Sequence, residues 1–288
     1  MNPKYPIYVI TYKRWDTRMT ERALEEMKVP YFLVVDKDDI PKYAAKASKY
    51  CTILELPKHY REEYDTFWKS EGPLCSGPAR NFVWDHSQNA GDKRHWVLDD
   101  NIGGFVRLYK NKKIMCKSGS FFKAMEDFTD RFSNVAISGP DYRFFAEQNT
   151  QLPPYVVNHK MYSCLLINNE IPFRWRGRYN EDVDLCIRVM KGKLCIIQFK
   201  AFLQNKAATQ TVKGGNNEAI YQDEGTLKKT QMLKEMHPDV VEMVLRYGRP
   251  HHFVNYKPFE RFGLKPIEGL KIKKGINEYG MKLIEVPR

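Results

Sequence analysis

The chain has 288 residues, of which 42% are hydrophobic and 28% charged, with six cysteines and a formal net charge of +12. These values exclude a disordered chain, and because no two cysteines form a C-x-x-C pair we expect reduced, structural thiols and no zinc site. The positive charge favours polyanionic partners, namely nucleic acid, phosphorylated cofactors or an anionic surface.

Apolar runs bounded by turn residues alternate with helix-like stretches along the first hundred residues. The patterns predict strands and helices in turn at 6–12, 16–27, 31–36, 40–48, 52–56, 77–89 and 95–98. This alternation predicts an α/β fold in which helices flank a mostly parallel sheet.

The rest of the chain is less regular, and residues 155–168 form either one long strand or a hairpin. Further helices are predicted at 120–132, 181–190 and 218–247 with a break at Pro238, and further strands at 135–138 and 193–203. The composition changes after the glycines at 214–215. We therefore expect a domain at 1–215 and a helical, basic C-terminal extension at 216–288 that packs on it.

No apolar stretch approaches the roughly 20 residues that a membrane span needs. The first fourteen residues contain a short apolar run between charged residues and no small-residue cleavage site, unlike a secretory signal. We expect no membrane partner and a cytoplasmic location.

The strongest chemical signal is the sequence Asp99-Asp100-Asn101, which follows directly after an apolar strand. Ligands of open α/β sheets bind beyond the carboxyl ends of strands, so a site is expected here. Oxygen ligands suit Mg²⁺ or Mn²⁺, which bind a carboxylate or two together with a substrate diphosphate. The alternative is a solvated acidic turn.

A second acidic cluster, Glu181, Asp182 and Asp184, opens a predicted helix. A carboxylate at this position is suited to take a proton from an acceptor hydroxyl as general base. Helix capping is the simpler explanation for acids in a first turn.

Basic and aromatic side chains crowd just before this helix: Arg174, Trp175, Arg176 and Arg178. Such residues contact phosphates and stack on exposed bases, but an equally good reading buries the tryptophan and leaves the charges in solvent. The pair His251-His252 has no third ligand at metal spacing, so we expect an ordinary surface pair.

Four motifs together resemble those of a GT-A glycosyltransferase in order and spacing: Thr11-Tyr12-Lys13-Arg14, Gly77-Pro78-Ala79-Arg80-Asn81, Asp99-Asp100-Asn101 and Glu181-Asp182-x-Asp184. Within that fold the chain is most similar to the TET-associated glycosyltransferases of bacteriophages. That family is associated with glycosylation of 5-hydroxymethylated pyrimidines in DNA. The resemblance implies a Rossmann-like GT-A domain over residues 1–215.

The resemblance also implies roles for individual residues on the donor side. A nucleotide-sugar donor, expected to be UDP-linked, would contact Thr11, Tyr12, Arg14, Asp36, Arg80, Asp99 and Lys213. Asp100 and Asn101 would hold a divalent ion, Mn²⁺ or Mg²⁺. Because Asn101 stands where the family has a second aspartate, either Asp100 is the main ligand or the dependence on metal is reduced.

On the acceptor side, the resemblance implies an inverting displacement. Asp182 would be its base, with Glu181 as the alternative, and Asp184 would orient the helix or the acceptor. Arg174, Trp175, Arg176 and Arg178 would contact the DNA. A phage-encoded chain would act in the cytoplasm of an infected bacterium, and no obligate protein partner is expected.

Three other functions remain open on the residues alone. The acceptor of a GT-A enzyme is alternatively a saccharide, a lipid or a protein. A non-catalytic nucleic-acid-binding protein would use the positive charge and need no acids at two separate sites. A nucleotidyltransferase would likewise place carboxylates around a metal ion and a diphosphate.

Overall fold

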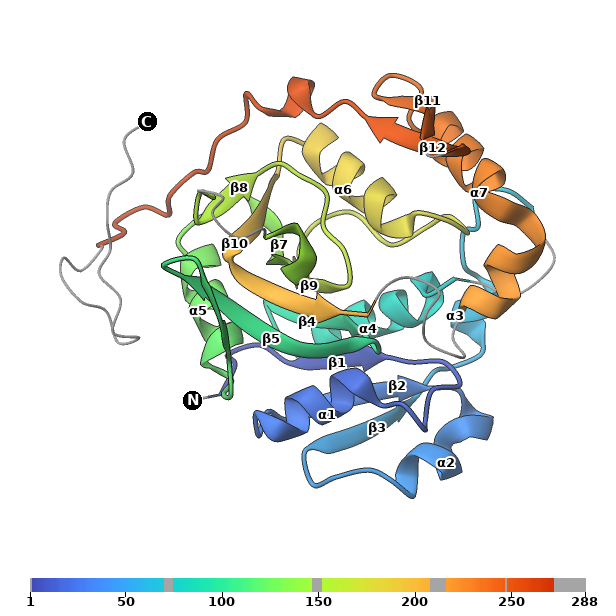
Figure 1. Ribbon diagram of the computed structural model, residues 1–288, viewed down its shortest axis with the longest axis vertical. Helices are drawn as coiled ribbons and strands as arrows, with labels where there is room; N and C mark the ends of the chain where they lie inside the picture. The colour runs from blue at the N-terminus through green and yellow to red at the C-terminus, as the bar shows by residue number, and fades with distance from the viewer. Residues whose placement is uncertain (1, 70–74, 147–151, 208–215, 247, 272–288) are drawn as a thin grey trace.

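The structure is a computed structural model that describes residues 2–69, 75–146, 152–207, 216–246 and 248–271. Over these ranges a large sheet is covered by helices on both faces, and a small hairpin stands apart from it (Figure 1). The strands are β1 (Ile7–Ile10), β2 (Tyr31–Val35), β3 (Cys51–Glu55), β4 (Arg94–Asp99), β5 (Ile102–Tyr109), β6 (Lys112–Met115), β7 (Val135–Tyr142), β8 (Tyr155–Val157), β9 (Cys164–Asn168), β10 (Cys195–Lys206), β11 (Val241–Arg246) and β12 (Arg249–Val254).

The helices cover the sheet or the hairpin. They are α1 (Met19–Glu26), α2 (Ile40–Ala44), α3 (His59–Glu62), α4 (Gly77–Asn89), α5 (Ser120–Thr129), α6 (Glu181–Lys191) and α7 (Asn216–Met236), with short 3₁₀ turns η1 (Lys37–Asp39), η2 (Arg143–Phe145) and η3 (Lys257–Phe259). None of the described helices is both long and apolar enough to cross a bilayer.

The large sheet has the strand order β3-β2-β1-β4-β9-β7-β10-β5-β6, and β8 also pairs with β10. The pairings give β1, β2, β3, β4, β6, β7 and β10 one direction, and β5, β8 and β9 the opposite one. The predicted α/β fold with a mostly parallel sheet is confirmed.

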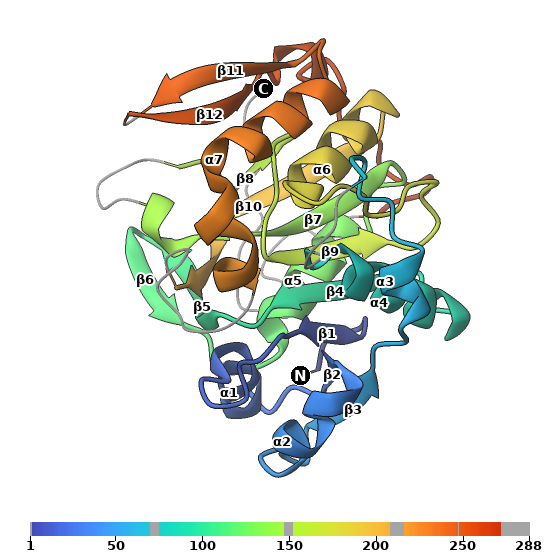
Figure 2. The ribbon, with the colours of Figure 1, turned by 90° about the vertical axis from the view of Figure 1, so that its right-hand side faces the viewer.

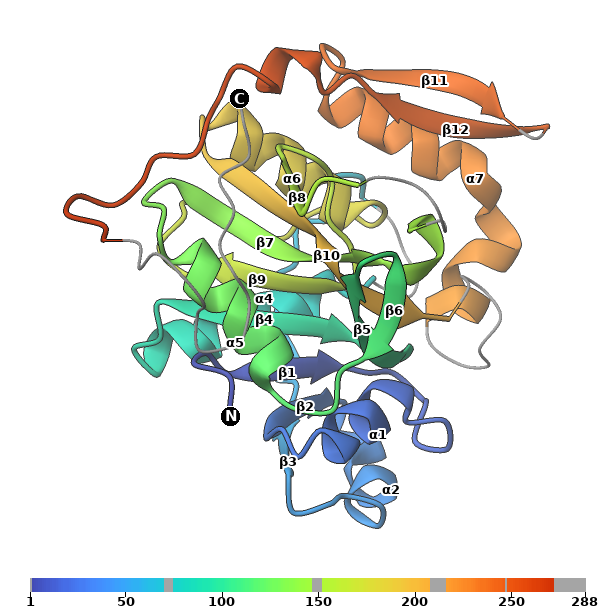
Figure 3. The same cartoon turned by 60° about the vertical axis from the view of Figure 1, so that its left-hand side comes forward.

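Two apolar cores form because the central strands are buried on both faces. Tyr8 and Val97 pack on one face with residues of α4 and α6, while Val9 and Trp96 pack on the other with residues of α1 and α5. Alternate residues of β1 and β4 thus point to opposite cores, as the period of a strand requires. Figure 3 shows α1 and α5 on the near side of the sheet, with α4 behind it.

Residues 155–168 form neither one strand nor a hairpin, so this prediction is wrong. β8 pairs with β10, whereas β9 lies between β4 and β7. The segment that joins β8 to β9 therefore crosses from one part of the sheet to another, which sequence proximity does not indicate.

The predicted helix at 218–247 is wrong beyond its break. α7 ends at Met236, before Pro238, and residues 241–246 form β11 of a hairpin with β12. α7 packs on both strands of this hairpin and lies alongside α6 in Figure 2.

The hairpin β5–β6 was not predicted from the sequence. Its turn has positive φ at Lys110 and Asn111, whereas the usual sequence signal for such a turn is asparagine followed by glycine.

The chain order places a ligand crevice at the carboxyl end of the sheet. After β1 the chain builds β2 and β3 on one side and then returns to form β4 on the other side of β1. Such a reversal leaves a crevice beyond the carboxyl ends of the two central strands. Strands β7 and β10 run in the same direction and end at the same edge.

Gly139 permits a close approach of β7 to β9, and its replacement tests this packing. A Cβ atom at Gly139 would lie 2.3 Å from the carbonyl oxygen of Cys164, whereas one at Gly263 would meet nothing within 4 Å. We expect Gly139→Ala to lower the free energy of unfolding by about 1–3 kcal/mol, measured by urea denaturation. Gly263→Ala is the control, and equal stability of the two variants would contradict this account.

Candidate active site

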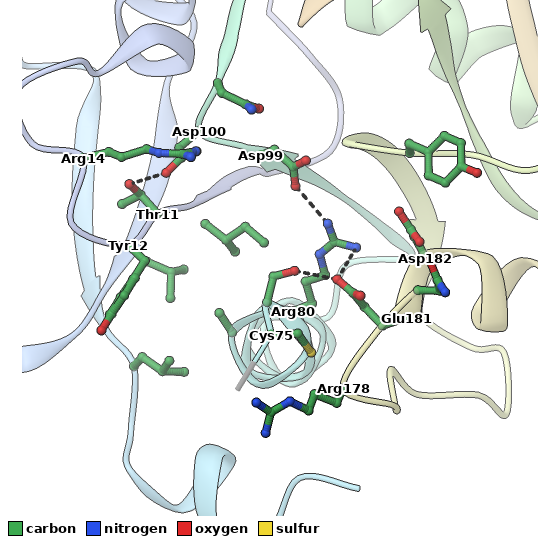
Figure 4. Close-up of a pocket in the computed structure, with 18 of the residues that line it drawn as sticks. Thr11, Tyr12, Arg14, Cys75, Arg80, Asp99, Asp100, Arg178, Glu181 and Asp182 are labelled. Atoms are coloured by element: carbon green, nitrogen blue, oxygen red, sulfur yellow. Dashed lines mark hydrogen bonds and ion pairs between the residues drawn. The ribbon is translucent and has the colours of Figure 1, made fainter. Parts of the chain in front are cut away.

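A pocket of about 390 Å³ opens at the carboxyl edge of the sheet. Its size is within the range of small-molecule sites. Together with the predicted acceptor residue Arg178, most of the predicted donor, metal and base residues line it: Thr11, Tyr12, Arg14, Asp36, Arg80, Asp99, Asp100, Asn101, Glu181 and Asp182. Figure 4 shows Arg80 and Asp99 between Asp100 on one side and Asp182 on the other.

The residues after β1 hold Asp100 in place. The Thr11 hydroxyl donates to Asp100 Oδ2 at 2.9 Å, and the Arg14 guanidinium pairs with Asp100 Oδ1. Tyr43 adds a third support, since its hydroxyl lies 2.7 Å from Thr11 Oγ1 and accepts from the Arg14 backbone. Burial raises the pKa of Asp100 even though Arg14 and Thr11 oppose this effect.

Asp99 lies between two cations from different elements. Its Oδ1 accepts from Arg80 Nη2, at the start of α4, and its Oδ2 accepts from Lys206 Nζ, at the end of β10, both at 2.9 Å. Burial favours the neutral acid, but the charges of Lys206 and Arg80 outweigh burial and lower the pKa of Asp99. Asp99 is therefore a carboxylate that fixes two positive groups in the pocket.

Arg80 is a buried cation with unused donors. Its residue is 3% exposed, its guanidinium stacks 4.6 Å from the Trp175 ring centre, and it lies 3.7 Å from Glu181. Nε and Nη1 are buried and have no hydrogen-bond partner among the described residues. Buried donors normally find partners, and Arg80 lines this pocket, so the residue is suited to an anionic ligand such as a diphosphate.

The residues predicted to hold a divalent ion do not fit one as arranged here. Both oxygens of Asp99 and both of Asp100 are engaged by the protein's own groups. Of these residues only Asn101 has a buried oxygen, Oδ1, without a hydrogen-bond partner, and no three His, Cys, Asp or Glu residues in the described ranges are arranged to hold a metal ion. A single neutral amide oxygen is a poor site for Mg²⁺ or Mn²⁺, so the metal ion stays a prediction.

Asp182 has the properties of a general base. It lies in the first turn of α6, and its Oδ1 accepts from the Val183 backbone at 2.8 Å. Burial and the charge of Glu181 raise its pKa to about 6, against the opposing charges of Arg80 and Lys229. A carboxylate of this pKa is still ionised at neutral pH and is a stronger base than an ordinary aspartate.

Glu181, the alternative base, is tied to the protein. Its Oε1 accepts from Ser76 Oγ at 2.6 Å and faces Arg80. These contacts hold Glu181 against the start of α4 and leave Asp182 less constrained by partners. The left-handed conformation of Asn180, at φ 53°, turns the chain into α6 and brings both acids to the pocket.

Asp184 is not in the pocket. It is fully buried and bound by His237 Nε2 at 2.9 Å, Arg188 at 2.7 Å and Arg176 at 3.2 Å. Burial opposes ionisation, but the hydrogen bond from His237 and the two arginines lower the pKa of Asp184. The group joins α6 to the residues after α7 and orients the helix without contact with the pocket.

The predicted acceptor residues are divided. Arg178 lines the pocket, whereas Trp175 is buried against Arg80, and Arg176 binds Asp184. Arg174 lies over the Trp84 ring and donates to Gln88 at 2.9 Å. Trp175 is thus positioned to support Arg80 and not to stack on a base, and Lys213 lies outside the described residues.

The sequence analysis missed several pocket residues, among them Tyr142, Tyr162, Lys206, Lys229 and His252. Tyr142 and Lys206 end strands β7 and β10, so the rule that found Asp99 applies to them once those strands are placed. The prediction that His251 and His252 form an ordinary surface pair is wrong for His252, which is half-buried and lines the pocket. Burial and the charges of Lys229 and Lys160 lower the pKa of His252 to about 4.

Comparison with known proteins identifies the family of the chain. The family model described as TET-associated glycosyltransferase matches residues 5–215. A search of the curated proteins finds no match. The matched range includes the residues that line the pocket from β1 to β10, and it ends before Lys229 and His252.

Replacement of Asp184 tests its assignment as a structural residue. Asp184→Asn leaves Arg176, Arg188 and His237 without their shared carboxylate, so we expect a loss of roughly 2–4 kcal/mol in unfolding free energy. The control is Asp239→Asn, which removes a surface pair with Lys191 worth at most about 1 kcal/mol. Thermal or urea unfolding measures both, and a loss below that of the control would contradict the assignment.

Proposed function

Because the chain belongs to the TET-associated glycosyltransferase family, and so is a glycosyltransferase, we propose that it moves a sugar from a nucleotide-sugar donor to the hydroxyl of 5-hydroxymethylated pyrimidines in DNA. The observation that carries the proposal is that a basic carboxylate, Asp182, and a fixed pair of cations, Arg80 and Lys206, line one pocket. Transfer needs a proton acceptor and a site for the leaving group side by side.

The donor's leaving group is a nucleoside diphosphate, which needs positive charge. Arg80 has two buried N–H groups without a hydrogen-bond partner among the described residues, and Lys206 is held beside it through Asp99. Fixed cations that face a developing anion lower the barrier because they need no reorganisation during the reaction. Asp36 and Thr11, at the ends of the neighbouring strands, would contact the nucleoside, for which we retain UDP.

The acceptor hydroxyl reacts on the side of Asp182. The carboxylate takes the hydroxyl proton while the hydroxyl oxygen forms a bond to the anomeric carbon. The bond from that carbon to the phosphate oxygen breaks, and its electron pair leaves with the diphosphate. Attack opposite the leaving group inverts the anomeric carbon, and a positioned base of this kind contributes typically 10²- to 10⁴-fold.

The DNA acceptor is supported by chemistry as well as by the family's description. The net charge of +12 favours a polyanion, and Arg178 lines the same pocket as the two acids. The hydroxymethyl group of a modified pyrimidine supplies the primary hydroxyl that the base requires. The bacteriophage origin and the cytoplasmic location stay predictions.

The proposal is tested by mass analysis of nucleosides after incubation with hydroxymethylated DNA and a mixture of UDP-hexoses. We expect a hexose-sized increment on the hydroxymethylated nucleoside, and kcat/KM should fall as the pH is lowered through about 6, because Asp182 must be ionised. Asp182→Asn should lower kcat at least 100-fold. Its stability should not fall, since the variant no longer buries a carboxylate.

Glu181→Gln is the matched control: it should keep turnover and an acid limb, but the limb should shift to lower pH because the charge of Glu181 no longer raises the pKa of Asp182. Near-normal turnover by Asp182→Asn would remove this residue from the mechanism. A sugar transferred to a saccharide, lipid or protein, with none on DNA, would overturn the acceptor while it leaves the enzyme class intact.

A further inference from the structure

An aromatic cluster extends from the acceptor side of the pocket to the protein surface. It consists of Tyr142 and Tyr162, which line the pocket, and of Phe144 and Phe145, which follow β7 in η2. The ring of Tyr142 is nearly parallel to that of Phe144, at 5.1 Å and 14°, and to that of Tyr162, at 6.1 Å and 5°. Phe145 lies 4.3 Å from Phe144.

The outer half of this cluster is exposed to an unusual degree. Phe144 and Phe145 are 59% and 57% exposed, although apolar side chains of this size favour the core. Adjacent exposed aromatics beside a pocket typically mark a binding surface. Two exposed phenylalanines that continue a stack into the pocket are suited to bind a flat apolar face.

The inner half of the cluster meets the reacting groups. The Tyr142 hydroxyl lies 2.9 Å from Ser163 Oγ, which is also bonded to Lys206. Tyr162 and the proposed base Asp182 line the same pocket. Burial raises the pKa of Tyr162, and the charge of Asp182 raises it further. The cluster thus connects the surface to Asp182.

Positive charges accompany the rings. Lys206 Nζ lies 5.9 Å from the centre of the Tyr142 ring, and Lys160 Nζ lies 5.5 Å from that of Tyr162. Arg143 is exposed between Tyr142 and the two phenylalanines. Aromatic faces interleaved with cations fit a nucleic-acid strand, whose bases stack on the rings while its phosphates meet the charges.

We propose that Tyr142, Phe144, Phe145 and Tyr162 form a stacking platform for an unpaired base of the acceptor strand, next to Asp182. This inference rests on the proposed DNA acceptor and names the part of the site that binds it. A base inside a duplex has both faces covered, so the platform takes a base of a single strand or one extruded from the duplex. Phe144 and Phe145 are positioning residues in this account, because they bind the strand and do not contact the reacting atoms.

The double variant Phe144→Ala/Phe145→Ala tests the platform. We expect its affinity for a single-stranded oligonucleotide that contains hydroxymethylcytosine, measured by fluorescence anisotropy, to fall roughly 10- to 100-fold. The slope of log K against log salt concentration should stay unchanged, because stacking releases no counterions. The thermal shift with UDP should equal that of the wild type.

The control is Leu245→Ala, which removes a 75% exposed side chain on β11 and should bind the oligonucleotide like the wild type. Equal oligonucleotide affinity of the double variant and the control would overturn the platform. If the double variant and the control bind equally well but the wild type glycosylates DNA, only the platform is wrong and the proposed function stands. A wild type that does not bind this oligonucleotide and modifies no hydroxymethylated DNA, single- or double-stranded, would overturn both proposals.

Discussion

The site depends on one partly buried carboxylate, Asp99, which holds two cations that would otherwise repel each other. Arg80 comes from α4, Lys206 from β10, and Asp99 from the end of β4, so the three groups join three elements at one edge of the sheet. Trp175 closes the back of Arg80. Desolvation of two cations is costly, and the shared carboxylate offsets part of that cost while both cations line the pocket.

Part of this site could be predicted from the sequence because its signals are local. Asp99 ends an apolar strand and Asp182 begins an amphipathic helix, and both positions are visible without a fold. Lys206 was not found, since its place beside Asp99 depends on β10 running parallel to β7 and on β9 lying between β4 and β7. Trp175 was ambiguous for another reason: a tryptophan between arginines fits a buried ring and an exposed ring equally well.

The charges of the pocket are unequally divided between its two sides. On the donor side, Arg80 and Lys206 are paired with Asp99, whose pKa is lowered, and Arg14 is paired with the buried Asp100. These ion pairs fix the positions of the cations. Near Asp182 the balance differs, because Glu181 adds negative charge and raises the pKa, and Lys229 arrives from α7. Lys229 and His252 lie beyond residue 215, where the family match ends, and both line the pocket with the proposed base. His252 is neutral because burial lowers its pKa.

The most direct test of the central claim is calorimetric binding of UDP in EDTA and again with Mn²⁺. If Arg80 and Lys206 supply the charge that the diphosphate needs, the wild type binds UDP in EDTA, and Mn²⁺ changes the affinity by less than about tenfold. Lys206→Met should then bind UDP at least about tenfold more weakly, an energy of roughly 1.4 kcal/mol. Lys200→Met, which removes another ion-paired lysine of β10, should bind UDP like the wild type. Binding that appears only with Mn²⁺, and equally in both variants, would contradict the account.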